Sequence, residues 1–342
     1  MSQPDKVVVV GGAGFIGRRL TKLLLETGNR VTVVSRSAGS RRSHHPRLEY
    51  QTGNVSDAAR MLEITEGASA VYELSLGGGQ HWADYEREVI GGAVNCARAC
   101  LHHGVRRMIY ASSIAALYLG RGGNIRDTDA NDANHPKRGM YSRGKSLAER
   151  KLFEMHVRDG LPVVIFRPGV VVGPGGALAH YAIGERPSDT CILGWGRGNH
   201  PLPFVLVDDV AQAMFLAKDA PGVEGMSFNL VGDVRPTAAE YVQYLRQRTL
   251  RNFRFYPRSV WLIQAAELTR WSAKKLARKR DNVLSPYRDL KTLTMTTQFD
   301  CSESKRLLHW KPVADREEFL RQAIDSLLTP IPAGDLRLEK AG

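Results

Sequence analysis

The chain has 342 residues, of which 43% are hydrophobic and 24% charged, a composition that fits a folded globular protein and excludes a disordered or fibrous one. Its length predicts one large α/β domain, or one domain and a half. No apolar run approaches the roughly 20 residues of a membrane span, no secretory signal precedes the first strand, and the four cysteines lack metal-type pairing. We therefore expect a cytoplasmic protein without a metal, in which Cys96 and Cys100 are small core residues.

The net charge of +13 is concentrated in one part of the chain. Residues 251–280 contain nine Lys or Arg, including Arg278, Lys279 and Arg280, and a single acid, Glu267. Such a cluster indicates a surface for an anionic partner and says nothing about the fold.

The first element carries the strongest signal. The four valines at 7–10 predict a strand that is buried on both faces, and a helix begins near Phe15. Between them, glycine permits a tight turn, close approach of the backbone to a pyrophosphate, and close packing of the helix. The helix directs its free N–H groups and its positive dipole end at that phosphate. The residues expected to hold a dinucleotide here are Gly11, Gly14, Phe15, Ile16 and Gly17.

Strand and helix patterns then alternate. Helices are expected at 18–26, 85–102 and 141–158, and strands at 30–34, 48–51, 70–76, 107–111 and 163–167. This order predicts a parallel sheet with helices on both faces and a ligand at the carboxyl ends of its strands.

The character of the chain changes after residue 176. Residues 177–203 are expected to be rich in loops, and 237–330 to be mostly helical and basic. We therefore predict a dinucleotide-binding domain at 1–176 and a smaller substrate-binding lobe at 177–342. Residues 204–233, which read as strand, helix and strand, return to the first domain. The tail after Pro330 is expected to be loose.

A chemical site is predicted from three side chains. Tyr141 and Lys145 lie four apart in a predicted helix, so the phenol and the ammonium share one face. A nearby cation lowers the pKa of a phenol, which could then exchange a proton with an alcohol or a ketone. Ser113 ends a predicted strand, where its hydroxyl could hold the substrate oxygen or could cap a helix.

Taken together, these motifs resemble the extended short-chain dehydrogenases/reductases, of the epimerase/dehydratase superfamily. The matching segments are GGAGFIG, YASS, YSRGK, FRPGVVVGPGG and PLPFVLVDDVA, within about residues 5–235. The resemblance implies a Rossmann-type doubly wound sheet. It also implies that Tyr141 is the catalytic acid/base, that Lys145 lowers its pKa and binds the nicotinamide ribose, and that Ser113, rather than Ser112, orients the substrate.

The resemblance further places Val55, Leu74 and Pro168 beside the cofactor. Three positions depart from the family pattern: Val89 replaces an asparagine that backs the lysine, Glu73 a histidine, and Asn54 an aspartate. Asn54 could still hydrogen-bond the adenine.

The end of the second strand favours NADP(H) over NAD(H), although NAD(H) stays possible. An acid there would bind the 2′-hydroxyl of NAD, but Ser35 occupies that place and Arg36 follows. The Arg36 guanidinium could pair with a 2′-phosphate, with Arg41 and Arg42 adding charge.

Three functions remain open. The segment GRGNHPLPFV is similar to the 3β-hydroxysteroid dehydrogenase and sterol-4-carboxylate 3-dehydrogenase branch, which implies oxidation of a sterol 3-hydroxyl, with loss of carbon dioxide where a 4-carboxyl is present. The second function is a nucleotide-sugar epimerase or dehydratase, against which the lack of an obvious nucleotide-binding stretch counts. The third is a non-catalytic NADP-binding protein, which Ser113, Tyr141 and Lys145 disfavour.

The basic segment 258–280 has two interpretations. Trp261, Ala265, Leu268 and Trp271 could line one face of a helix, which suits a membrane interface and a lipid-like substrate. Alternatively, this helix covers the substrate lobe with a solvated basic side. We expect no nucleic-acid partner, and a homodimer only by analogy with the family.

Overall fold

The computed structural model describes residues 4–37, 43, 45–117, 123–132, 138–277, 284, 286–294 and 296–328. Arg41, Arg42, the basic residues 278–280 and the tail after Pro330, all named in expectations above, lie outside these residues.

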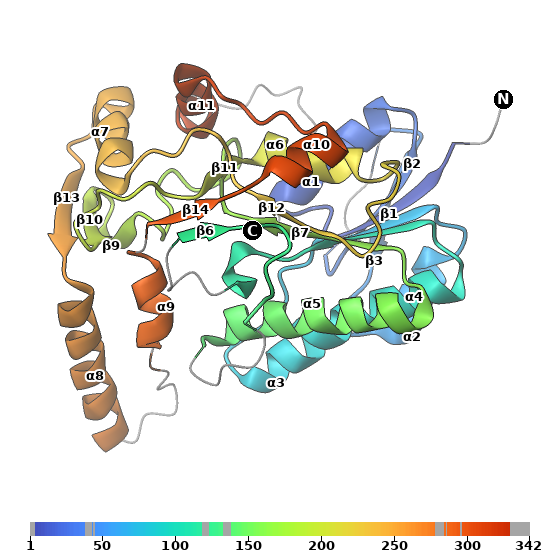
Figure 1. Cartoon of the computed structure of the whole chain (residues 1–342), viewed down its shortest axis with the longest axis horizontal. Coiled ribbons are helices and arrows are strands. Elements are labelled where there is room, and N and C mark those ends of the chain that lie inside the picture. Colours follow the sequence, from blue (N-terminus) through green and yellow to red (C-terminus); the bar gives the residue numbers. More distant parts are fainter. Residues whose placement is uncertain are drawn as a thin grey trace.

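A seven-stranded parallel sheet forms the centre of the molecule, in the order β12-β7-β5-β4-β1-β2-β3 (Figure 1). The strand order reverses between β1 and β4, so the predicted doubly wound α/β fold is confirmed. The strands are β1 (Lys6–Val10), β2 (Arg30–Ser35), β3 (Leu48–Thr52), β4 (Ala70–Glu73), β5 (Arg107–Ala111), β7 (Val163–Pro168) and β12 (Ser227–Leu230).

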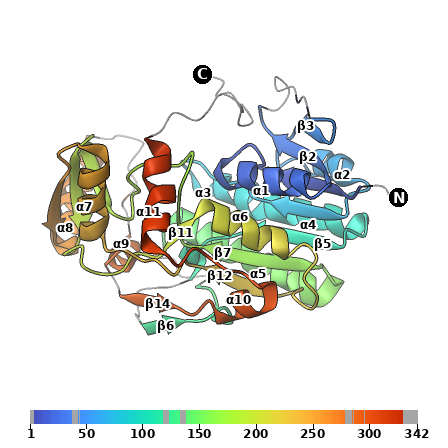
Figure 2. The ribbon, with the colours of Figure 1, turned by 90° about the horizontal axis from the view of Figure 1, so that it is seen from above.

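Helices cover both faces of this sheet (Figure 2), and the side chains of β1 alternate between them. Val7 and Val9 face the core under α1 (Phe15–Glu26) and α6 (Val207–Leu216). The opposite core contains Val8 and Val10 and lies under α2 (Ala58–Thr65), α4 (Gly92–His102) and α5 (Met140–Asp159). All four valines are at most 3% exposed, which explains why the run has no polar member. Cys96 and Cys100 are buried in α4, as predicted.

The structure departs from the local predictions in three places. β4 ends at Glu73 rather than at residue 76, because Gly77 and Gly78 adopt positive φ and turn the chain out of the sheet. The helix predicted at 85–102 is preceded by α3 (Trp82–Asp84) and begins as a π-helical segment, Tyr85–Gly91. Helix α2 was missed, although Asp57 caps it by accepting a hydrogen bond from the Arg60 N–H at 3.0 Å.

The second lobe lies beside the carboxyl ends of the strands and contains a small sheet that was not predicted (Figure 1). Its strands come in the order β13-β10-β9, and its core includes Tyr241, Phe253 and Phe319. Its elements are β9 (Gly184–Ser188), β10 (Cys191–Trp195), α7 (Ala238–Thr249), β13 (Arg254–Arg258), α8 (Val260–Leu276), α9 (Tyr287–Thr292) and α11 (Arg316–Ala323).

Short elements join the two parts. β8 (Val170–Val172) pairs with β11 (Phe204–Leu206), and β6 (Gly123–Ile125) pairs with β14 (Thr297–Phe299). Cys301, α10 (Ser302–Leu308) and Trp310 pack into the core under α1 and α6, although the sequence assigned them to the substrate lobe. Short 3-10 helices occupy Ile114–Ala116 and Asp325–Leu327.

Helix α8 projects from the second lobe (Figure 1), and Gln264 is its one buried residue. Trp261, Ala265 and Leu268 are exposed, as a shared outward face requires. Trp271 does not join them fully, because it is half-buried and the Lys275 ammonium lies 4.8 Å from its ring centre.

Candidate active site

The glycine turn between β1 and α1 has no room for side chains. A Cβ on Gly17 would overlap the Gly11 carbonyl oxygen and lie 2.5 Å from the Gly12 Cα. Gly11 has a φ of +79° and donates its N–H to the Val34 carbonyl oxygen at 2.9 Å. At Gly14, no side chain caps α1, and its first turn carries no acid. The N–H groups in the first turn of α1 are therefore available to an anion.

One cavity of about 1350 Å³ opens from this turn toward the second lobe. Two expected cofactor contacts do not reach its surface, because Pro168 ends β7 below it and Lys145 is buried under the wall. The other expected cofactor positions all line it: Gly11, Gly14, Phe15, Ile16, Gly17, Ser35, Arg36, Asn54, Val55, Leu74 and Tyr141.

The end of β2 fits a dinucleotide ribose. The Ser35 hydroxyl is buried and has no hydrogen-bond partner among the described residues, so it can bind an incoming oxygen. Arg36 is exposed at the rim of the cavity, and no described acid pairs with it. Asn54 uses its side-chain oxygen to accept the Ser56 N–H at 3.1 Å, and the amide of Asn95 donates to the Val55 carbonyl at 2.9 Å. A nicotinamide dinucleotide therefore fits this half of the cavity.

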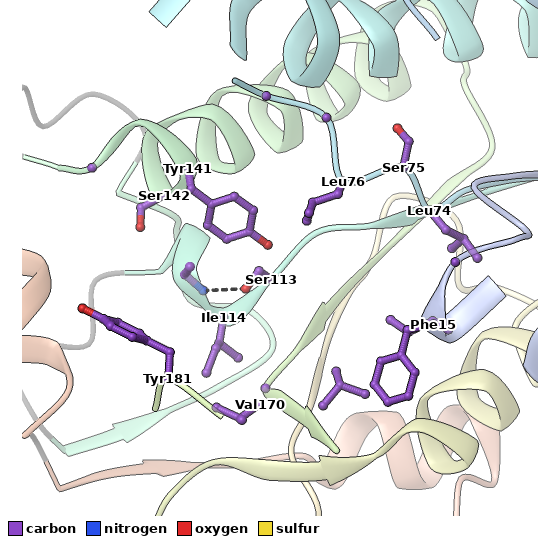
Figure 3. Close-up of a pocket in the computed structure, with 18 of the residues that line it drawn as sticks. Phe15, Leu74, Ser75, Leu76, Ser113, Ile114, Tyr141, Ser142, Val170 and Tyr181 are labelled. Atoms are coloured by element: carbon purple, nitrogen blue, oxygen red, sulfur yellow. Dashed lines mark hydrogen bonds between the residues drawn. The ribbon is translucent and has the colours of Figure 1, made fainter. Parts of the chain in front are cut away.

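Tyr141 and Ser113 meet across the centre of the cavity (Figure 3). The neighbouring Ser113 hydroxyl lowers the pKa of Tyr141, but burial raises it more, so the phenol is protonated at neutral pH. The Ser113 hydroxyl also accepts the Ala115 N–H at 3.1 Å and so caps a 3-10 helix. Of the two roles considered for this serine, the helix cap is observed, and the residue also lines the cavity.

Ser112 points away from the cavity. It is buried and its hydroxyl donates to the Glu149 carboxylate. Because neighbouring residues in an extended chain point to opposite sides, only Ser113 faces Tyr141.

The position of Lys145 differs from the one expected beside the Tyr141 phenol. Its ammonium donates to the Ala111 carbonyl at 2.7 Å and to the Tyr110 hydroxyl at 3.3 Å, and its residue is 3% exposed. Tyr141 therefore does not show the lower pKa that the spacing of four residues predicted. The physical reason is that the ammonium turns into the sheet, toward β5, instead of lying along the helix surface.

Behind these residues lies a charged group that the sequence interpretation missed. Arg167 donates to both oxygens of Glu149, with its closest contact at 2.8 Å, and the two side chains are 6% and 2% exposed. Glu149 follows Lys145 by four residues on α5. That spacing was the one available signal, since nothing in the sequence shows that β7, the next strand, places Arg167 against this face of α5.

The other end of the cavity is mostly apolar. Its arginine, Arg138, lies just before α5. The side chain of Arg138 is 2% exposed and is held by Asp289 at 2.8 Å and Asp132 at 3.3 Å. Burial lowers the pKa of His180 and His200, so both are neutral. Lining residues here include Leu76, Ile114, Leu117, Met140, Val170, Tyr181, Leu202, Leu284, Pro286, Leu290, Leu293 and Phe299.

The sequence interpretation missed this apolar wall. Its last five members lie more than 140 residues after Tyr141 in the chain, and no local pattern marks them. Among the described residues, this end of the cavity offers no cation that is not already in an ion pair.

The family model for the NAD dependent epimerase/dehydratase family matches residues 7–230. The chain is 26% identical to a 2-alkyl-3-oxoalkanoate reductase of Stenotrophomonas maltophilia, over 63% of this chain and 66% of that protein. It is 24% identical to 3beta-hydroxysteroid-dehydrogenase/decarboxylase isoform 2 of Arabidopsis thaliana, over 93% and 61%. The chain thus spans less than two thirds of the length of these relatives.

Other proteins similar to this chain have names that refer to neither a steroid nor a 3-oxoalkanoate. The chain is 25% identical to the UDP-glucose 4-epimerase of Vibrio cholerae, over 95% of this chain and 96% of that one. Among solved structures, gox2253 is similar with a TM-score of 0.73 and 22% identity, over 94% of this chain and 97% of that one. MoeE5 in complex with UDP-glucose and NAD has a TM-score of 0.70 and 20% identity, over 94% and 98%. At these identities the structures establish the fold alone.

Proposed function

Because the chain belongs to the NAD dependent epimerase/dehydratase family, we propose that it is an NADP(H)-preferring oxidoreductase acting on a secondary alcohol or ketone of a large apolar molecule. The favoured substrate carries the 3-hydroxyl of a sterol or steroid-like body. The observation that carries this proposal is the apolar end of the cavity, whose buried arginine is already paired with two aspartates.

The side chains divide the chemistry as follows. When bound, the nicotinamide accepts or supplies the hydride. Ser113 holds the substrate oxygen, and Tyr141 exchanges the hydroxyl proton with it: the phenol donates to a ketone, and the phenolate accepts from an alcohol. Lys145 lies beneath the cavity wall and supports the end of β5, because its ammonium donates to the Ala111 carbonyl. We assign dinucleotide binding to residues 1–176 with about 204–233, and substrate binding to the remainder of 177–342 except residues 301–310, which pack under α1 and α6.

A nucleotide sugar fits this cavity less well. Its diphosphate carries at least two negative charges, and burying them without cations costs several kcal/mol or more. Arg138 is already neutralised, and the two histidines of this end are uncharged. The epimerase therefore remains the alternative function.

The names of the relatives support an apolar substrate. A sterol 3-hydroxyl and a 3-oxoalkanoate both present one secondary alcohol or ketone on a hydrocarbon body. If a carboxyl group lies one carbon from the new ketone, the β-keto acid can lose carbon dioxide without help from further side chains.

Turnover tests this proposal directly. Purified protein should reduce NADP+ with sterols, including 4-carboxy sterols, or oxidise NADPH with 2-alkyl-3-oxoalkanoates. Tyr141→Phe should lower kcat by about 100-fold or more, since it removes the proton-transfer group. Tyr256→Phe, on the exposed strand β13, is the matched control and should retain full activity. Conversion of UDP- or dTDP-sugars without response to either lipid panel would refute the proposal.

Cofactor preference has a separate test. Ser35 and Arg36 place no acid against a 2′-phosphate, and Arg36 has no acidic partner among the described residues. Arg36→Ala should weaken the binding of NADP+ at least about tenfold, the value of one charge-assisted contact, and leave the affinity for NAD+ nearly unchanged. Equal losses for both cofactors would remove the argument.

We also propose that α8 meets an anionic membrane surface. Nine exposed residues fall on its outward side at about 3.6 residues per turn, and none is charged. Arg270, Lys274 and Lys275 flank them. The nine are Trp261, Leu262, Ala265, Ala266, Leu268, Thr269, Ser272, Ala273 and Leu276.

A mostly apolar, uncharged face bordered by cations is the pattern of a helix that lies in a lipid interface. A second copy of the chain would bring the same cations against each other, which disfavours self-association through this face. The apolar cavity wall at Leu284, Pro286 and Leu290 follows α8 in the chain, so a lipid could enter near this surface. No helix among the described residues is long and apolar enough to cross a membrane.

Vesicle sedimentation tests the membrane contact. The protein should sediment with vesicles that contain phosphatidylglycerol more than with pure phosphatidylcholine. The double variant Trp261→Glu/Leu262→Glu should lose this binding, whereas Leu62→Glu, a partly exposed leucine on α2, should keep it. Equal sedimentation of all three proteins would refute the membrane contact.

The family resemblance also favours a homodimer through paired helices. Phe153 and Val157, one turn apart on α5, are 51% and 71% exposed and could form the centre of such a contact. Light scattering should give twice the chain mass for the wild type and the chain mass for Phe153→Glu. A monomeric wild type would exclude the dimer.

A further inference from the structure

Glu73 is a buried acid that the proposed reaction does not yet use. It is the last residue of β4, is 2% exposed, and lies directly across from Tyr110 of β5 and Val10 of β1. Paired residues in neighbouring parallel strands point to the same face. Tyr110 and Val10 belong to the core under α2, α4 and α5, so the Glu73 carboxylate faces that side too.

Lys145 enters the same face from α5. Its ammonium lies 3.3 Å from the hydroxyl of Tyr110, the cross-strand neighbour of Glu73. Burial raises the pKa of Glu73, and the charge of Lys145 opposes that rise. Burial lowers the pKa of Lys145, and the charges of Glu73 and Glu149 oppose that fall. Each charge thus opposes the neutralisation that burial favours in the other group.

The other groups around Lys145 do not supply a free negative charge. Glu149 already pairs with Arg167, which donates to both of its oxygens. Burial raises the pKa values of the Cys96 thiol of α4 and of the Tyr110 and Tyr141 phenols, so all three are neutral. Glu73 has no ion pair of its own among the described residues, and its carboxylate accepts only from the N–H and hydroxyl of Ser75.

Given the proposed oxidoreductase site, we propose that Glu73 is the positioning residue of Lys145. Its carboxylate is the counter-ion that keeps the ammonium charged and fixed beneath the Ser113–Tyr141 pair.

Unfolding in urea tests the pairing without any substrate. Glu73→Gln, Lys145→Met and the double variant should be compared by tryptophan fluorescence at about pH 7.5. Each single change leaves one buried charge alone, so the double variant should unfold at or above the midpoint of the weaker single variant. Asp209→Asn, a buried acid under the opposite face, should combine additively with Lys145→Met. Additive midpoint shifts for Glu73 and Lys145 would overturn the proposal.

The pH profile tests the consequence for the reaction. In Glu73→Gln, kcat for ketone reduction should fall about tenfold or more between about pH 6.5 and 8.5. The unsupported ammonium loses its proton and with it the charge-assisted bond to the Ala111 carbonyl, which holds the end of β5 two residues before Ser113. The wild type should change less than about threefold, and Glu73→Asp should restore its profile. A wild-type profile in Glu73→Gln would overturn the proposal. An inactive wild type would instead refute the proposed function, and the urea comparison would still decide the pairing.

Discussion

Replacing Glu149 with Gln should lower the free energy of unfolding by about 3 kcal/mol. Breaking one partner of a buried ion pair costs roughly 3–5 kcal/mol, because the remaining charge is left uncompensated. Arg167 is 6% exposed and would keep its contacts to the Asp127 and Asp129 carbonyls at 3.2 and 3.3 Å. Glutamine also retains one acceptor, so the lower end of the range applies.

This loss should be visible as a shift in Tm. The entropy of unfolding is about 2.1 cal/mol/K per residue, or about 0.7 kcal/mol/K for 342 residues, so 3 kcal/mol corresponds to about 4 °C. Calorimetry and urea unfolding both measure it. Glu154→Gln is the matched control on the same helix: its carboxylate is 46% exposed, and its pairs with Arg150 and Lys151 contribute about 0.5 kcal/mol or less.

The double variant Glu149→Gln/Arg167→Met separates charge from packing. It removes the stranded guanidinium and should recover most of the lost stability. If Glu149→Gln costs less than about 1 kcal/mol, or if the double variant loses the sum of both single changes, the buried pair does not carry the stability assigned to it here.

Three further outcomes are expected. Gly17→Ala should weaken the binding of NADP+ at least about tenfold in a fluorescence titration, because the added methyl group displaces the backbone of Gly11 and Gly12. An unchanged affinity would contradict the assignment of this turn to dinucleotide binding. Burial raises the pKa of Asp127 to about 7, above its unfolded value of about 3.9, so the folded protein binds the proton more tightly and loses stability as pH rises from about 4 to 7. In Asp127→Asn, the free energy of unfolding should fall about 2–4 kcal/mol less over this pH range than in the wild type. Parallel curves of unfolding free energy against pH for the two proteins would exclude a raised pKa of Asp127. Because the pKa of Tyr141 is raised, alcohol oxidation should increase up to at least about pH 9, and a rate that levels off near neutral pH would disagree.

The sequence by itself determined the features that depend on neighbouring residues. The buried valine run, the glycines of the turn and the start of α1 are local requirements of backbone geometry, so the first βα unit and the parallel sheet could be predicted. The same holds for Ser113 at a strand end and Tyr141 in the first turn of α5, which the fold brings to one cavity. Local patterns were less reliable at element ends, where Gly77 and Gly78 shortened β4.

Only the tertiary structure decided what surrounds those residues. Lys145 turns toward β5 rather than toward Tyr141, and Glu149 meets Arg167 of β7, because of the way α5 packs against the sheet. The apolar wall that favours a lipid-like substrate is completed by residues 284–299. Burial, charge pairing and cavity shape depend on which segments pack together, and a contact between residues more than 100 positions apart leaves no periodic trace in the sequence.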